Sequence, residues 1–315
     1  MRRASSVQGA GAWGARQSCA RRSGAHRSRP RGSLTSNAYR APLKDLASFT
    51  PAPAERCIYC GATEDLRDEH ILPFGLSGPA AIPRASCGTC ARITGAVEGE
   101  ILRGPLWPLR VFRNLKSRTR HRDAPRTVDL TLDYPDGRSE PTQVPIERAP
   151  VVFIFPVFAP PGIIQPRGYT RGIRVKGSAM VGYDNGYKRL LKDYGASSIS
   201  LSQTTTPSTF ARMIAKIAYA MAFADGSIAR IGGTSPIISS ILGESDDVGF
   251  WVGSFTETPP KHPKLLHHMV GREYREHGVF AYEVQLFADL QAPHYSVVLG
   301  NLPPTTEAGA ETSPA

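Results

Sequence analysis

The sequence has no apolar run that approaches the roughly 20 residues needed to cross a bilayer. Its most apolar stretch, residues 151–159, is interrupted by Pro156 and is typical of a buried strand. No apolar segment follows the arginine pair at positions 2 and 3, which excludes an ordinary secretory signal. We therefore expect a soluble, cytoplasmic protein with no membrane partner.

Acidic residues are absent from positions 1–40, which carry nine arginines. The chain has a net charge of +11, so most of its basic character lies in this segment. Arginine, serine, glycine and alanine dominate there without hydrophobic periodicity, which predicts disorder. We interpret residues 1–54 as a basic tail and linker. It could be a nucleic-acid-binding arm, a transit-type presequence, or an extension upstream of the true start.

Cysteine is scarce, with five residues in 315. Four of them form two CxxC pairs, Cys57/Cys60 and Cys87/Cys90, and Cys19 stands alone in the tail. Without an export signal, such pairs indicate metal binding rather than disulfides. Zinc prefers four thiolate or imidazole ligands in a tetrahedron, and closed four-ligand sites are usually structural. We expect one structural Zn²⁺ on these four cysteines.

The chain is long enough for one large domain or two ordinary ones, and its patterns predict an α+β fold. We expect a zinc module at 55–104, a basic connector at 105–127, a larger α+β region at 128–302 and a disordered end at 303–315. Strands are expected at 128–132, 151–158, 250–255, 279–287 and 295–299. A helix is expected at 210–224, preceded by Thr206 as its N-cap. His267 and His268 are interpreted as structural, because neighbours on a strand face opposite sides.

The 26 residues between the cysteine pairs are more than a plain zinc ribbon requires. Residues 66–72 and 81–86 are predicted to be the two strands of a hairpin. A helix should begin after Cys87 and end at Gly104 and Pro105. The expected order is strand, strand, helix, with zinc holding the ends together because some fifty residues build only a small core.

Three stretches of this module are CIYCG at 57–61, DEHILPFGLSG at 68–78 and CGTC at 87–90. With the helix that follows, they resemble the zinc-containing HNH endonucleases, members of the ββα-metal nuclease group with a treble-clef-like fold. The resemblance covers about fifty residues. Its most specific part is an acidic residue and a histidine lying between the two cysteine pairs.

The resemblance implies metal-dependent hydrolysis of DNA phosphodiester bonds. His70 corresponds to the general base, and Glu69 to the carboxylate that helps hold a catalytic Mg²⁺ or Mn²⁺. Asp68 is the alternative carboxylate, and Glu98 is the candidate for the further ligand on the helix. Because strand neighbours point to opposite faces, a bulge or a strand end is needed to bring Glu69 and His70 to one site.

The sequence departs from the family in one respect, the asparagine that orients the catalytic histidine. No asparagine lies between Gly75 and Cys87, and Ala91 stands where one often follows the last cysteine. An alternative is therefore a catalytically degenerate HNH fold that binds nucleic acid without cleaving it. A third is an interaction protein whose working part is residues 128–302.

Basic residues are dense directly after the predicted helix. Residues 103–126 carry eight arginines and lysines against one acidic residue, with aromatic residues interleaved. This pattern suits a phosphate backbone, and affinity from it should fall with salt. The expected DNA contacts are Arg84, Arg110, Arg113, Lys116, Arg118 and Arg120.

Overall fold

The structure is a computed structural model that describes residues 49–117, 126–165, 169–201, 203, 205–255 and 258–304. The α+β class predicted from the sequence is confirmed. The strands are β1 Leu66–His70, β2 Ala81–Cys87, β3 Thr127–Asp133, β4 Ser139–Pro145, β5 Val151–Phe158, β6 Val175–Tyr183, β7 Ser198–Ser200, β8 Val252–Ser254, β9 His267–Tyr274, β10 Val279–Leu286 and β11 His294–Asn301. The α-helices are α1 Gly88–Arg103, α2 Trp107–Phe112, α3 Tyr187–Tyr194, α4 Pro207–Ala224 and α5 Ile238–Leu242.

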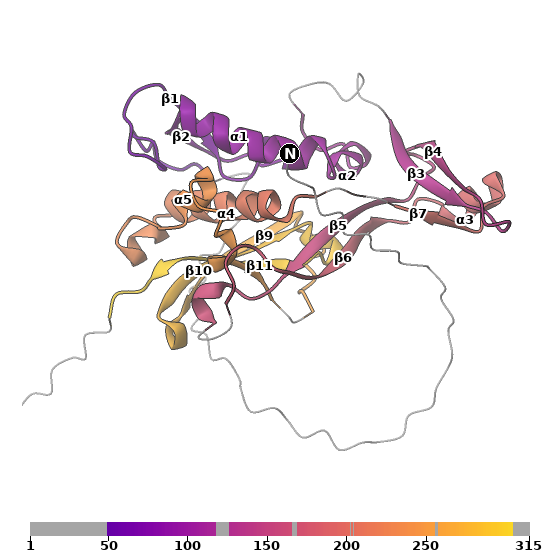
Figure 1. Ribbon diagram of the computed structural model, residues 1–315. Coiled ribbons are helices and arrows are strands. Elements are labelled where there is room, and N and C mark those ends of the chain that lie inside the picture. The colour runs from indigo at the N-terminus through magenta and orange to yellow at the C-terminus, as the bar shows by residue number, and fades with distance from the viewer. Residues whose placement is uncertain are drawn as a thin grey trace, which may run out of the picture.

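The described strands form four antiparallel sheets. β1 pairs with β2 as a hairpin, and β5 pairs with β6. β3 lies between β4 and β7, and the largest sheet has the order β8-β11-β10-β9. Figure 1 shows β3, β4, β7 and α3 together at one end of the molecule, away from α4 and α5. The hairpin and α1 lie at the opposite side of α4 from the four-stranded sheet.

Helix α4 is the central element of the fold. It contacts α1 on one side and β10 and β11 on the other (Figure 1). Residues around its whole circumference are buried, as expected of a helix covered on both sides. Pro207 lies in its first turn, and Thr206 precedes it as predicted, although without a side-chain capping bond. Among the described residues, neither this helix nor any other is long and apolar enough to cross a membrane.

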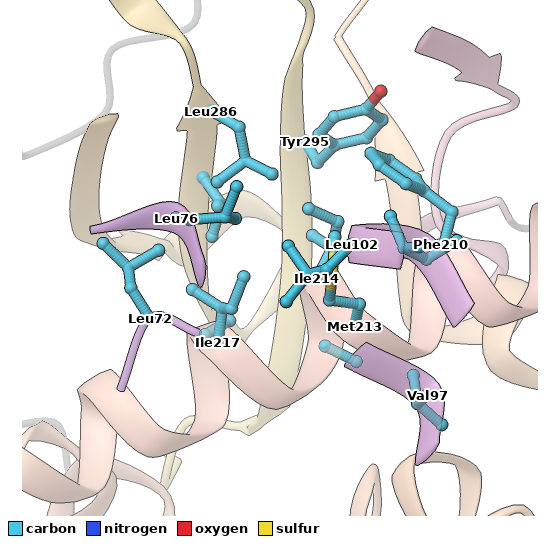
Figure 2. Close-up of a cluster of buried hydrophobic side chains, with 14 of the residues drawn as sticks. Leu72, Leu76, Val97, Leu102, Phe210, Met213, Ile214, Ile217, Leu286 and Tyr295 are labelled. Carbon is cyan, nitrogen blue, oxygen red and sulfur yellow. The ribbon is translucent and has the colours of Figure 1, made fainter. Parts of the chain in front are cut away.

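One hydrophobic core joins the cysteine segment, residues 55–104, to the rest of the chain. Figure 2 shows side chains from four parts of the chain in one cluster. Leu72 and Leu76 come from the loop after β1, whereas Val97 and Leu102 come from α1. They meet α4, and β10 and β11 contribute the remaining wall. The labelled residues from α4 are Phe210, Met213, Ile214 and Ile217, and those from the sheet are Leu286 and Tyr295.

Most predicted elements are present, with changed ends. The predicted strand 66–72 ends at His70, because the chain turns into a 3-10 helix, η1, at Phe74–Leu76. The predicted strand 250–255 is reduced to β8, because Val248–Phe250 forms another 3-10 turn. The predicted basic connector contains helix α2. Residues 1–48 and 305–315, including Cys19, lie outside the described residues.

Candidate metal site and cleft

The first cysteine pair lies in a tight turn directly before β1. The Cys57 N–H donates to the Ala62 carbonyl at 2.7 Å, and the Gly61 N–H donates to the Cys57 carbonyl at 2.9 Å. Gly61 has a φ of 78°, which glycine adopts without a steric penalty. The turn closes on itself in this way, with Cys57 and Cys60 both inside it.

The second pair joins a strand to a helix. Cys87 is the last residue of β2, and Cys90 lies in the first turn of α1. All four cysteine sulfur atoms lie within 4.8 Å of one another, and the Cys60 and Cys87 sulfurs are 3.6 Å apart. Tetrahedral zinc with Zn–S bonds of about 2.3 Å separates its sulfur ligands by roughly 3.8 Å. The four are free thiols and could hold a metal ion such as zinc.

The thiols differ in how readily they ionise. The backbone N–H of Cys90 lowers the pKa of the Cys87 thiol to about 7, which favours the thiolate. Burial raises the pKa of the Cys90 thiol instead. Thiolate is the form that binds metal, and a bound cation deprotonates its thiol ligands. A bound cation would offset the burial that opposes ionisation of the Cys90 thiol.

A cleft of about 830 Å³ opens along the cysteine segment. Its walls are the end of β1, η1, one face of α1 and α2, and Lys216 reaches it from α4. The residues beside Cys90, Thr89 and Ala91, lie on its wall. The four side chains that sequence analysis assigned to catalysis and the catalytic ion all line this cleft. They are Asp68, Glu69, His70 and Glu98.

An irregularity in the hairpin brings Glu69 and His70 to the same cleft. The register of β1 against β2 shifts between Arg67 and Glu69, and His70 is the last residue of the strand. A register irregularity and a strand end are thus present where the sequence predicted that one of them is needed. Glu69 is 4% exposed, whereas His70 is half-buried with its ring 5.7 Å from the ring of Phe74.

Lys216 is the residue of this site that sequence reasoning missed. Its Nζ lies 2.7 Å from Glu69 Oε1 and 2.8 Å from Glu98 Oε1. It also donates to the backbone carbonyl of His70. One turn later, the Tyr219 hydroxyl donates to the carbonyl of Ile58 in the first cysteine turn. Helix α4 thus holds both the cysteine turn and the end of β1.

The carboxylates of this cleft leave no open position for a divalent ion. Glu69 and Glu98 contact the Lys216 ammonium, and Asp68 is exposed, with one oxygen accepting the Arg84 N–H at 3.2 Å. Within the described part of the chain, the four cysteines are the one group of three or more Cys, His, Asp and Glu that lies close enough to share an ion. The Mg²⁺ or Mn²⁺ implied by the family resemblance has no such donor set in this cleft.

Arg110, expected to contact DNA, is buried at 4% exposure. Its Nε donates to the Gly75 carbonyl at 2.6 Å and its Nη1 to the Leu102 carbonyl at 2.8 Å. Burial lowers the pKa of its guanidinium. Arg110 therefore ties η1 to the end of α1 through two backbone carbonyls.

The other predicted DNA contacts fall into three groups. Arg113 is mostly buried and paired with Asp289 at 2.8 Å. Arg84 is exposed but paired with Glu55 at 2.7 Å, and Lys116 is exposed above the ring of Phe74. The remaining two, Arg118 and Arg120, lie outside the described residues.

Helix α1 supplies basic side chains to the cleft that were not among the predicted contacts. Arg92 and Arg103 are exposed and line the cleft, as does Arg67 from β1. Gly95 and Gly99 lie between the two helix arginines on the same face of α1. Because glycine has no side chain, this part of the cleft wall carries no bulky group between the arginines. The three- and four-residue spacing of these positions is a helical signal that was readable in the sequence.

Comparison with known proteins gives no relatives. No protein-family model, no curated protein and no solved structure matches this chain.

Proposed function

We propose that the cleft hydrolyses phosphodiester bonds of nucleic acid, with DNA as the substrate and His70 as the general base. The observation that carries this is the joint placement of His70, the acidic residues Asp68, Glu69 and Glu98, and exposed arginines in one cleft beside a four-cysteine site. The strand, strand, helix order of β1, β2 and α1, with the cysteines at its ends, supports an HNH-type ββα module.

Zinc is the metal proposed for the four cysteines. Four cysteine ligands, whose sulfurs lie within 4.8 Å of one another, would leave no open position for substrate, which is the pattern of structural zinc. Such an ion would hold the turn before β1 against the start of α1. A zinc ion there would shape the wall of the cleft, to which Thr89 and Ala91 belong, and would take no part in hydrolysis.

His70 suits the role of general base by its position. His70 lines the cleft, and Lys216 donates to its backbone carbonyl. A neutral imidazole can accept a proton from water near neutral pH, and a well-placed general base contributes about 10²–10⁴-fold to a rate. Arg92, Arg103 and Arg67 would neutralise phosphate charge across the cleft.

The test is nicking of supercoiled plasmid by the purified full chain. His70→Ala should lower the cleavage rate by about 10²–10⁴-fold, because the water loses its proton acceptor. His277→Ala is the matched control, since His277 is exposed in the turn after β9 and does not line the cleft. Equal cleavage by wild type and His70→Ala would refute this role for His70.

A second candidate, a module that binds nucleic acid without cleaving it, is favoured by one observation. The Lys216 ammonium engages Glu69 and Glu98, the two carboxylates that a nuclease of this type would use. Fluorescence anisotropy with labelled DNA distinguishes the candidates. Salt-dependent binding that weakens in Arg92→Ala, together with no cleavage by wild type, would establish the binding module.

A further inference from the structure

Three oxygen atoms surround the end of the Lys216 side chain. They belong to the Glu69 carboxylate, the Glu98 carboxylate and the His70 backbone carbonyl. An ammonium group has three N–H donors, so these three acceptors match its donors one for one. The Lys216 side chain is 3% exposed and that of Glu69 is 5% exposed, so solvent has little access to either. The Glu98 side chain is 19% exposed at the cleft, so the result is a largely buried cation position filled by the protein itself.

Lys216 keeps its positive charge in this position. Burial lowers the pKa of a lysine, but the negative charges of Glu69 and Glu98 outweigh it, and the pKa of Lys216 is raised. The residue sits on α4, whose neighbouring residues are packed in the core. A divalent ion would have to displace this ammonium and would then meet a positive charge close to its ligands. The same two carboxylates cannot serve both cations.

We propose that Lys216 is the resident cation of the cleft, so that Glu69 and Glu98 take no divalent ion and phosphodiester hydrolysis at His70 proceeds without one. The second half rests on the proposed function. In that reaction the oxygen of water bonds to phosphorus as the ester P–O bond breaks. His70 accepts the proton of the attacking water, and the leaving oxygen takes a proton from solvent. The arginines on the cleft wall, Arg67, Arg92 and Arg103, carry the charge of the phosphate.

Mn²⁺ binding to the full chain tests the first half of the proposal, that Lys216 keeps a divalent ion away from Glu69 and Glu98. Protein passed over a chelating resin, with its zinc content counted afterwards, is titrated with Mn²⁺ and followed by electron paramagnetic resonance. Mn²⁺ is a poor competitor for thiolates, so it should leave the cysteine site untouched. We expect no Mn²⁺ site in the wild type and about one per chain in Lys216→Ala, where three oxygens lose their partner.

Lys188→Ala is the matched control, because Lys188 is exposed on α3 and does not line the cleft. It should bind no Mn²⁺. One Mn²⁺ site in the wild type that is lost in Glu98→Gln would overturn the proposal. The comparison of the wild type with Glu98→Gln tests the proposal even where Lys216→Ala fails to fold.

The second half of the proposal, hydrolysis without a divalent ion, is tested by wild-type cleavage in the resin-treated buffer, with and without added Mg²⁺. Rates within about twofold of each other are expected, and an absolute requirement for Mg²⁺ would overturn the metal-independent reaction. No cleavage in either buffer would defeat the proposed function and this second half together. The Mn²⁺ titration would still decide whether Lys216 fills the cation position.

Discussion

His267 is a single residue that links the two sides of the core. Its Nδ1 accepts the N–H of Phe287 at 3.3 Å, and its Nε2 lies 2.9 Å from the carbonyl of Leu76 in η1. Both contacts are satisfied only by a neutral ring with its proton on Nε2. Burial lowers the pKa of His267 to about 4, well under the usual 6.5. The interpretation of His267 as structural fits this placement.

Acid should weaken the fold through this residue. Between pH 6.5 and about 4 the unfolded chain binds a proton at His267 that the folded chain does not. The free energy of unfolding should therefore fall as pH is lowered through that window. Burial also lowers the pKa of His268 and His294 to about 4, so they act in the same direction. Urea denaturation at several pH values across the window measures the slope.

His267→Gln is the variant that isolates this contribution. Glutamine keeps a donor and an acceptor but cannot be protonated, so the slope should be shallower than in the wild type. Lowering the pH to about 5 without any loss of wild-type stability would contradict this assignment.

The residues of the cleft differ in how far the sequence could predict them. His70, Glu69 and Glu98 were found because a local motif and helical spacing point to them. Lys216 was not, because it lies 146 residues from His70 and nothing in an apolar helix marks one lysine as buried. Arg110 was misplaced on the surface, because charge density along the chain does not reveal that backbone carbonyls surround it.

Among the elements, the turn from η1 to β2 allows little change. Ser77 is in the left-handed region with a φ of 63°, and Gly78 follows it. A Cβ on Gly78 would lie 2.3 Å from the carbonyl oxygen of Leu72, which is backbone and cannot move aside cheaply. Glycine at this position lets the chain fold back over Leu72.

Gly78→Ala should therefore destabilise the protein by about 1–3 kcal/mol, the range typical of overpacking. Gly95→Ala is the control on a neighbouring element. Gly95 is exposed in α1 with nothing near its Cβ position, so alanine there should stabilise by roughly 0.5–1 kcal/mol. Urea midpoints that shift equally in both variants would contradict the role of Gly78.

Elements with strong periodicity or turn signals were predictable, and short ones were not. The long helix α4 and the strands β3, β5, β10 and β11 carry apolar patterns that the chain itself shows. The short strand β7 and helix α5 carry too few residues for a period to appear. The secondary structure of such short segments depends on their tertiary contacts. Strand β6 was also not predicted, because most of its residues are exposed and show no alternation of apolar and polar residues. It pairs with β5 at one edge only.

At the scale of the whole molecule, the cysteine segment is part of the main core. Leu72, Leu76 and Val97 pack with α4, and α4 packs on the four-stranded sheet (Figure 2). Which chain segments share this core could not be read from spacing, because the contacts join residues more than a hundred positions apart. Loss of the metal should consequently lower the stability of the whole described fold and not of the cysteine turn alone.

Cys87→Ser tests this coupling. The wild type should carry about one zinc per chain, and the variant should lose it, because serine is a poor zinc ligand. We expect the melting temperature of the whole chain to drop, with near-ultraviolet circular dichroism lost in the same transition. Zinc is counted by mass spectrometry of the purified protein. A variant that lacks zinc yet melts like the wild type would show that the site is peripheral to the core.

The central claim, that the cleft hydrolyses phosphodiesters through His70, is tested most directly with a small substrate that needs no nucleotide sequence. Bis(p-nitrophenyl) phosphate releases a coloured nitrophenolate on cleavage. The wild type should release it in a zinc-retaining buffer, His277→Ala should match the wild type, and His70→Ala should be slower by about 10²–10⁴-fold. Release by His70→Ala at the wild-type rate, or none above background by the wild type, would contradict the claim.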